Sequence, residues 1–187
     1  MSSADYLFIT NWKVEGQKDE VYDILGDADG LARWWPSVYL DVKVLKPGDE
    51  AGVGKIVELF TKGWLPYTLR WSFEVTNANK PNGFTIVPSG DFIGRGIWTF
   101  EKDQENPLFC NITYDWKISA SKPLLKRLSF LVKPIFSANH LWAMRRGEES
   151  LRLELLRRKN MREGGSAIIP KAPGPTFPHN FNKNKIL

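Results

Sequence analysis

Residue types that build metal centres and covalent cross-links are scarce in this sequence. Its 187 residues include one cysteine, Cys110, and two histidines, His140 and His179. One cysteine cannot form an intrachain disulfide, and such scarcity is typical of a reducing compartment. The three residues show no spacing that would bind a metal ion. Because no P-loop, Rossmann fingerprint or nucleophile elbow appears either, we expect neither a metal nor a cofactor.

Long apolar runs and a recognisable leader are also missing. No stretch approaches the ~20 apolar residues that a membrane-spanning helix needs. The most apolar segment, Leu128–Phe136, is interrupted by Lys133 and Pro134. The first residues show no basic region followed by an apolar run, as a secretory signal would. Together with the single cysteine, these absences lead us to expect a soluble, cytoplasmic protein.

The excess of positive charge is confined to the C-terminal part of the chain. The net charge is +5, yet residues 145–187 carry ten basic and four acidic residues, and residues 1–144 carry sixteen and seventeen. A domain that reads nucleic acid usually has a basic face on its folded core, so we expect no specific nucleic-acid partner. Weak contact of the basic C-terminus with an anionic membrane stays open.

Aromatic residues, in contrast, are abundant, with eight Trp, eleven Phe and five Tyr. Many stand in runs where apolar and polar residues alternate, the pattern of a strand with one buried face. With turn signals between them, these runs predict strands at Tyr6–Val14, Val38–Leu45, Val53–Thr61, Tyr67–Thr76, Gly83–Val87, Phe92–Glu101 and Leu108–Ser119.

Apolar residues at helical spacing predict the remaining elements. Two short helices follow the first strand, a third covers Lys122–Val132, and Pro134 opens a long last helix that reaches about Lys159. Gly164-Gly165 ends this helix. The remaining C-terminal residues are rich in proline and basic side chains, so we expect one domain at residues 1–162 and a tail at residues 163–187.

This order of elements predicts the fold class. A strand, two helices, six further strands and a long helix make an α+β protein with an antiparallel sheet. Because helices are available for one side of the sheet only, the sheet must curl around the last helix to bury its apolar face. We expect a cavity between the curved sheet and that helix.

Several segments resemble a known superfamily. The element order, Trp34-Trp35-Pro36, and the segments 63–67, 90–96 and 139–144 are similar to the START-like (SRPBCC, helix-grip) superfamily, in its polyketide-cyclase-like bacterial branch. The resemblance covers about Asp5–Lys159. It implies a helix-grip fold whose known members bind lipids, sterols, plant hormones or polyketides, while a minority catalyse cyclisation, dehydration or ring hydroxylation.

Candidate ligand-binding residues follow from the strand faces and from the last helix. Aromatic residues on the apolar faces of the strands would line a space under the helix, or simply fill a core. On a helical wheel, His140 and Glu148 are the polar members of an otherwise apolar stripe centred on Met144. The predicted lining residues are Trp71, Phe73, Trp98, Tyr114, Trp116, His140, Met144 and Glu148.

Asp91 and Arg95 form a second candidate, as a pair that could orient a polar group of a ligand. Strict alternation faces both away from the cavity, unless Gly94 or Gly96 introduces a bulge. An ion pair at a structural turn is the simpler interpretation of these two residues.

These observations favour a non-catalytic or weakly catalytic protein that binds a small hydrophobic or amphipathic molecule, lipid-like or polyketide-like. The alternative is a cyclase or dehydratase in which His140 or Glu148 acts as general acid or base. A membrane-surface module that uses the basic C-terminus is a third hypothesis. The oligomeric state and the identity of the ligand stay open.

Overall fold

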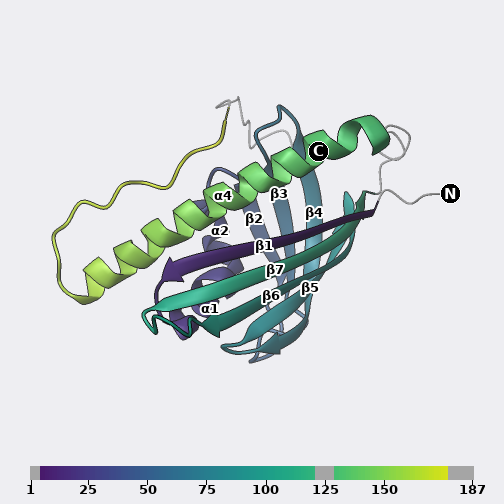
Figure 1. Ribbon diagram of the computed structural model, residues 1–187. Helices are drawn as coiled ribbons and strands as arrows, with labels where there is room; N and C mark the ends of the chain where they lie inside the picture. The colour runs from purple at the N-terminus through teal and green to yellow at the C-terminus, as the bar shows by residue number, and fades with distance from the viewer. Residues whose placement is uncertain (1–4, 121–128, 177–187) are drawn as a thin grey trace.

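The protein is built around one curved sheet, which the computed structural model describes together with its helices for residues 5–120 and 129–176 (Figure 1). In these residues the sheet has seven antiparallel strands in the order β1-β7-β6-β5-β4-β3-β2. The strands are β1 (Asp5–Glu15), β2 (Tyr39–Lys46), β3 (Ile56–Lys62), β4 (Thr68–Asn79), β5 (Gly83–Gly90), β6 (Phe92–Lys102) and β7 (Phe109–Ala120). The predicted α+β class, the antiparallel sheet and the order of the elements along the chain are confirmed.

Alternation along each strand decides which face of the sheet is buried. In β7, Ile112, Tyr114 and Trp116 are buried, whereas the residues between them are more exposed. β1 follows the same rule, with Trp12 paired to Ile112 across the two strands. The apolar residues thus gather on the concave face of the sheet, where they form the core.

Short helices close one end of this concave face. They are α1 (Lys18–Gly26), the 3-10 turn η1 (Ala28–Gly30) and α2 (Leu31–Trp34). Val21 and Ile24 of α1 are fully buried. Tyr22 contacts the rings of Phe84 and Phe100 edge-on, each at 5.8 Å between centroids. This end of the molecule is therefore a filled aromatic and aliphatic core.

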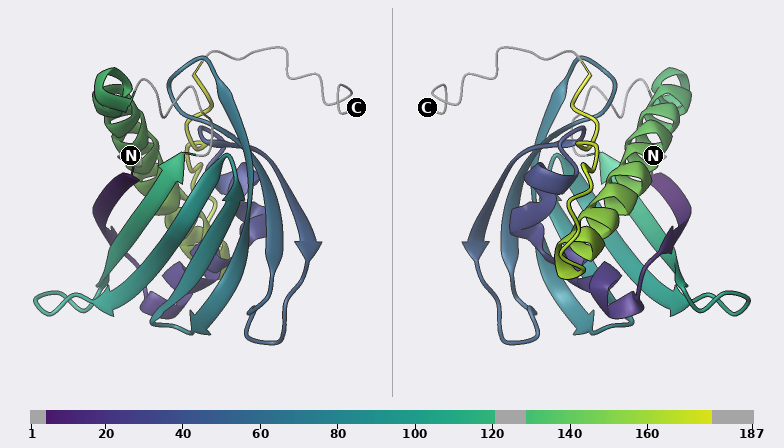
Figure 2. Two further views of the ribbon diagram at one scale, coloured as in Figure 1. Left: turned by 90° about the vertical axis from the view of Figure 1, so that its right-hand side faces the viewer. Right: turned by 90° about the vertical axis from the view of Figure 1, so that its left-hand side faces the viewer.

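The long helix α4 (Ser129–Arg162) crosses the open side of the sheet (Figures 1 and 2). Its predicted start was wrong, because Pro134 lies inside the helix and not at its first residue. Proline has no N–H, so one hydrogen bond of the helix is not made at this point. Pro134 is exposed, so water can replace the missing donor. Gly164, with φ of +64°, follows the last turn as predicted. Residues 122–128 of the predicted third helix lie outside the described residues.

A buried carboxylate ties α4 to α2. Glu154 is 4% exposed and accepts two hydrogen bonds from Arg33 of α2, at 3.0 and 3.1 Å. Arg157 and Arg158 donate to the same carboxylate, at 2.7 to 3.0 Å. Burial alone would raise the pKa of Glu154, but the hydrogen bonds from Arg157, Arg33 and Arg158 lower it to about 2. Glu154 is thus ionised and fully surrounded by donors.

The last described segment, residues 166–176, returns along α4 toward the loop between β3 and β4 (Figure 2). Ile169 of this segment lies in a groove that Leu153 of α4 also lines. At its end, the main-chain carbonyl of Thr176 accepts a hydrogen bond from the amine of Lys62. The segment therefore covers part of the outer side of α4 and ends beside the last residue of β3.

Replacing Glu154 with Gln is expected to lower the free energy of unfolding by about 2 kcal/mol, because the partly exposed guanidinium groups of Arg33, Arg157 and Arg158 lose their charge-assisted hydrogen bonds to a buried carboxylate. Glu148→Gln is the matched control on the same helix. Glu148 is 27% exposed and pairs with Arg152 at 2.6 Å, so its loss should stay below about 1 kcal/mol. Urea unfolding followed by circular dichroism near pH 7 measures both; equal losses would contradict a buried link between α2 and α4.

Candidate functional site

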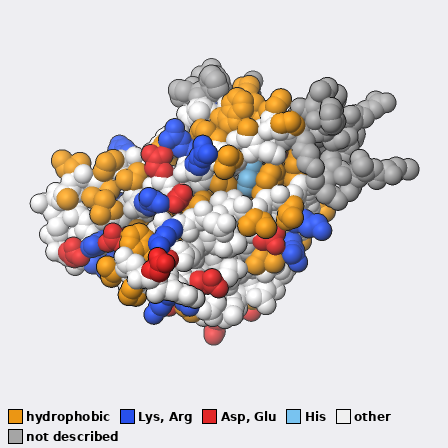
Figure 3. All heavy atoms as spheres, viewed as in Figure 1, with side chains coloured by type: hydrophobic (Ala, Val, Ile, Leu, Met, Phe, Trp, Pro, Cys, Tyr) orange, Lys and Arg blue, Asp and Glu red, His pale blue; other side chains and the backbone are white. Residues whose placement is uncertain are grey.

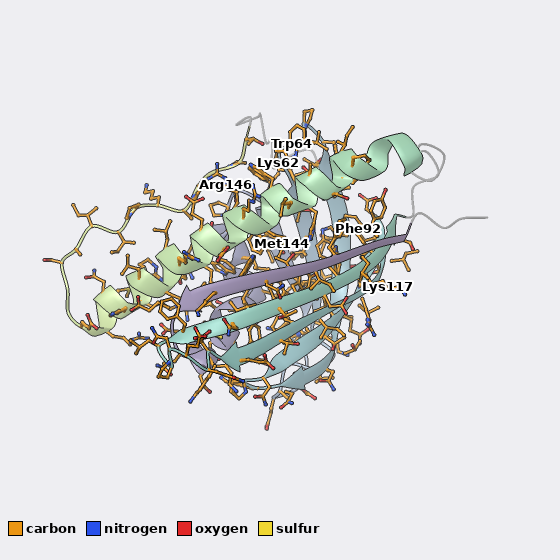
Figure 4. The ribbon with its side chains drawn as sticks, viewed as in Figure 1. Lys62, Trp64, Phe92, Lys117, Met144 and Arg146 are labelled. Carbon is orange, nitrogen blue, oxygen red and sulfur yellow. The ribbon has the colours of Figure 1, made fainter. Side chains whose placement is uncertain are left out.

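A cavity of about 130 Å³ lies between the concave face of the sheet and the N-terminal half of α4. An engineered cavity of roughly 150 Å³ in another protein binds benzene, so this space admits one aromatic ring or a short chain. β1, β3, β4, β6, β7, α4 and the chain after α2 all contribute to its wall. Figure 4 shows Met144 of α4 and Phe92 of β6 in the layer between the helix and the sheet.

The wall is mainly aromatic. The rings of Tyr114 and Trp116 stack at 5.5 Å between centroids, and Trp71 approaches Trp116 at 5.8 Å and Phe92 at 5.6 Å. From the other side, Phe136 of α4 lies 5.9 Å from the ring of Tyr6. Flat apolar faces of this kind favour apolar or aromatic groups of a ligand.

The cavity ends where Trp35 meets α4. A Cβ atom at Gly147 would lie 2.3 Å from the indole ring of Trp35, so the helix can approach this ring only because residue 147 has no side chain. The Trp35 ring also makes edge contacts with the rings of Trp12 and Tyr39, at 5.7 and 5.1 Å between centroids. The indole thus fills the space under the middle of α4 and separates the cavity from the packed core.

Few polar groups interrupt the apolar wall. Trp71 donates its indole N–H to Thr61 Oγ1 at 3.1 Å. The Tyr67 hydroxyl, His140 Nε2 and Trp35 Nε1 are buried and have no hydrogen-bond partner within the described part of the chain, and all three residues line the cavity. A buried polar atom without a partner is destabilising, so these atoms are available to a ligand or to water.

Burial keeps the imidazole of His140 and the phenol of Tyr67 in this wall neutral. The ring of His140 stacks on Phe8 at 4.1 Å, and burial lowers the pKa of His140 to about 4. Its imidazole is therefore uncharged near pH 7 and can donate or accept one hydrogen bond. Burial also raises the pKa of Tyr67 to about 12, so its phenol keeps its proton.

Five of the residues proposed from the sequence lie at the cavity wall. They are Trp71, Tyr114, Trp116, His140 and Met144. The strand residues arrive there because alternation directs them to the concave face. The helix residues arrive there because the stripe around Met144 faces the sheet.

Three other proposed residues lie outside this wall. Phe73 and Trp98 are buried on the concave face, but Phe73 lines a groove beside α1 and Trp98 is covered by Tyr114, whose ring stacks on it at 4.0 Å. Glu148 pairs with Arg152 and lies one helical turn beyond Met144, past the point where Trp35 closes the cavity.

The structure places Asp91 and Arg95 apart from the cavity wall as well. Asp91 accepts a hydrogen bond from the main-chain N–H of Arg70 at 3.1 Å. Arg95 pairs with Asp115 at 3.5 Å, and its side chain is 55% exposed. β6 runs beside β7 without a register shift, so Gly94 and Gly96 do not reverse the alternation that turns Arg95 outward.

Other lining residues were not predicted from the sequence. Tyr6 and Phe8 share the inward face of β1 with Trp12, and the alternation of that strand could have revealed them. Lys62 and Asn139 have no such signal. Lys62 is a charged residue at the end of a strand, and Asn139 reaches the wall because its Oδ1 accepts a hydrogen bond from the N–H of Leu65 at 3.3 Å.

The C-terminal basic residues of α4 are engaged by carboxylates. Arg157 and Arg158 bind Glu154, Lys159 lies 3.5 Å from Glu15, and Arg162 lies 2.7 Å from Glu20. Contact of this region with an anionic membrane stays a prediction. Among the described residues, no helix has the length and apolarity of a membrane span, and no group of three His, Cys, Asp or Glu residues could hold a metal ion.

The low pKa of His140 predicts a pH dependence of stability. The unfolded chain protonates this residue below its ordinary pKa of 6.5, whereas the folded protein does so only near pH 4. Stability should therefore fall as the pH drops through this window, by about 2 kcal/mol between pH 7 and pH 5. His140→Gln should remove that share of the loss, as urea unfolding at the two pH values would show. An unchanged pH dependence in the variant would contradict a buried, neutral imidazole.

Comparison with known proteins identifies the fold. No protein-family model matches the sequence, and no curated protein matches it. Several solved structures do match. A START superfamily protein from Mycobacterium smegmatis has 9% sequence identity and a TM-score of 0.62, over 81% of this chain and 98% of that one. A norcoclaurine synthase from Thalictrum, in complex with a transition-state analogue, has 15% identity and a TM-score of 0.57, over 85% of this chain and 99% of that one. The di-domain ARO/CYC protein BexL has 11% sequence identity and a TM-score of 0.58, over 80% of this chain and 49% of its own length. The protein therefore has the START-like, or SRPBCC helix-grip, fold.

Proposed function

We propose that the protein binds a small amphipathic molecule, lipid-like or polyketide-like, in the cavity under α4. The observation that carries this proposal is an aromatic cavity whose buried polar atoms on Tyr67, His140 and Trp35 have no partner within the described residues. A ligand with an apolar body and one or two polar groups would bury the body and complete those hydrogen bonds. Because burial of apolar area contributes about 25 cal/mol per Å², the body would supply most of the affinity.

The size of the cavity limits how much of the ligand is enclosed. A volume of about 130 Å³ is below the roughly 300 Å³ of typical drug-sized sites. One ring or a short chain would be enclosed, and the rest of a larger ligand would extend past the loop between β3 and β4. Figure 3 shows hydrophobic side chains gathered on the surface around the N-terminal half of α4, which would suit such an extension.

The proteins that share this fold support a small-molecule partner. One similar structure is of norcoclaurine synthase with a bound transition-state analogue, and another is of an ARO/CYC protein. The identities of 15% and 11% leave the ligand of this chain to be decided by its own residues. We also propose a cytoplasmic location, because Cys110 is a buried free thiol of the kind that persists in reducing compartments.

An enzyme of the cyclase or dehydratase type is the alternative. It is favoured by His140, whose neutral imidazole lies at the cavity wall and could accept a proton from a carbonyl-bearing ligand. Glu148 lies outside the cavity, so this alternative now rests on His140. If His140→Gln binds the ligand as well as the wild type but loses its turnover, the enzyme is supported; turnover unchanged in that variant would remove it.

The binding proposal predicts that a bulky side chain at residue 143 abolishes ligand binding. Ala143 lines the cavity, whereas Ala138 is exposed on the same helix. Titration calorimetry with phenylbutanol, a one-ring amphipathic alcohol, should give a dissociation constant on the order of 0.1 mM for the wild type, from roughly 0.5 kcal/mol per non-hydrogen atom. Ala143→Phe should weaken binding at least about tenfold by filling the cavity, and the matched control Ala138→Phe should leave it unchanged.

Circular dichroism of the two variants shows whether both are folded before binding is compared. Equal binding to the wild type and to a folded Ala143→Phe would mean that the alcohol binds elsewhere, and no binding to the wild type would refute the proposal for one-ring ligands.

A further inference from the structure

Residues 166–176, here called the strap, follow a seam beside the cavity. They contain no helix or strand and run along α4 on the side away from β1 (Figure 2). On the opposite side, α4 packs against β1. The strap ends at β3, where the carbonyl of Thr176 accepts a hydrogen bond from the Lys62 amine. The strap therefore lies over the seam between α4 and β3, two elements that both contribute to the cavity wall.

The loop between β3 and β4 is held from two sides at the end of this seam. On the helix side, Asn139 accepts a hydrogen bond from the N–H of Leu65 at 3.3 Å, and a Cβ atom at Gly63 would overlap the Asn139 amide. On the strap side, the Thr176 hydroxyl donates toward the carbonyls of Gly63 and Trp64, at 3.3 and 3.4 Å. A shift of the loop toward α4 is thus blocked by Asn139, and a shift away from α4 requires the loss of the Thr176 contacts.

The same loop forms part of the cavity wall. Gly63 at its start and Tyr67 at its end both line the cavity, as does Lys62 immediately before it. The contacts of Thr176 with residues 62, 63 and 64 therefore fix the position of the wall from outside the cavity. Movement of the loop away from α4 would open the wall at this point.

Before Thr176, the attachments of the strap are shallow. Near its start, the Asn160 amide donates to the carbonyl of Ala167 at 3.2 Å. In its middle, Ile169 is half-buried in a groove that Pro36 and Leu153 also line. Attachments of this kind can be released without unfolding the sheet or α4, because local openings cost less free energy than global unfolding.

Three prolines favour a reversible attachment. Pro170, Pro173 and Pro175 have restricted φ angles and no N–H donor, so the strap keeps an extended course without strand or helix hydrogen bonds. A chain that is already restricted when released loses less conformational entropy when it docks again. The strap can therefore dock and release with little change in its own conformation.

We propose that the strap is a latch that controls the exchange of ligand between the cavity and solvent. While the strap is docked, Thr176 holds the loop between β3 and β4 against α4; when the strap releases the loop, a molecule enters or leaves. This inference rests on the proposed function, since it concerns access to the same cavity. None of residues 166–176 is among the described residues that line the cavity. Weakening the latch should therefore change the rates of exchange and not the affinity.

NMR line-shape analysis of phenylbutanol titrations into the full chain near pH 7 tests the latch, because it gives both rate constants and the dissociation constant. Ile169→Lys removes the apolar anchor and adds a positive charge to a groove that Arg33 and Arg157 line. It should raise the association and dissociation rate constants together, by about fivefold or more, with the dissociation constant within about twofold of the wild type.

Ile168→Lys is the matched control. Ile168 is the neighbouring residue and is 96% exposed, so this variant has the same change of charge and should leave both rate constants unchanged. Thr176→Val removes the hydroxyl and keeps the shape of the side chain, so it should also speed up exchange, by about twofold or more. Circular dichroism shows that each variant is folded, and Thr176→Val alone serves if Ile169→Lys is not.

The outcomes separate the latch from the binding proposal. If Ile169→Lys combined with Thr176→Val exchanges phenylbutanol at the rate of the wild type, the latch is refuted and the cavity proposal stands. The latch is also refuted if Ile168→Lys accelerates exchange as much as Ile169→Lys, or if the variants weaken affinity without faster association. If the wild type does not bind the alcohol, the cavity proposal fails, and the latch fails with it.

Discussion

The approach of α4 to the indole of Trp35 sets the height of the helix above the sheet. A methyl group at Gly147 would lie 2.3 Å from that ring, so the contact depends on a glycine in the middle of a long helix. Beyond this point toward the C-terminus, Leu151 and Leu155 pack into the core and are nearly fully buried. Toward the N-terminus, the helix passes over the concave face without filling it, and the cavity occupies the remaining space.

The helix position has chemical consequences because few side chains reach the space under it. Aromatic rings of the strands supply flat apolar walls. The Tyr67 hydroxyl and His140 Nε2, which have no hydrogen-bond partner among the described residues, supply fixed points for hydrogen bonds. Burial keeps His140 neutral near pH 7 because it lowers the pKa of the imidazole. A mainly apolar molecule with one or two polar groups matches this distribution.

Local sequence patterns were sufficient for the fold and for one face of the site. Alternation in β4 and β7 places Trp71 and Tyr114 inward, because each strand has one buried face. Alternation does not say how far along a strand the cavity extends, which is why Phe73 and Trp98 share that face and yet lie outside the wall. For Glu148 the helical wheel gave a direction, but Trp35, from a distant part of the chain, closes the cavity before that residue.

Lys62 shows most clearly what a sequence pattern cannot reveal. Its amine donates a hydrogen bond to the carbonyl of Thr176, which lies 114 residues further along the chain, and nothing near Lys62 in the sequence marks it as part of a cavity. Pro134 is a comparable case, because its local preference for a first helical turn is overridden when α4 continues on its N-terminal side. Such contacts are set by the complete fold and not by local periodicity.

The most direct test of a cavity that binds an amphipathic molecule is a crystal structure of the protein with phenylbutanol. The phenyl ring is expected to lie between Trp71, Tyr114 and Met144, with the hydroxyl within hydrogen-bond distance of Tyr67 or His140. A structure in which repacked side chains fill this space, with phenylbutanol bound only on the outer surface, would contradict such a cavity.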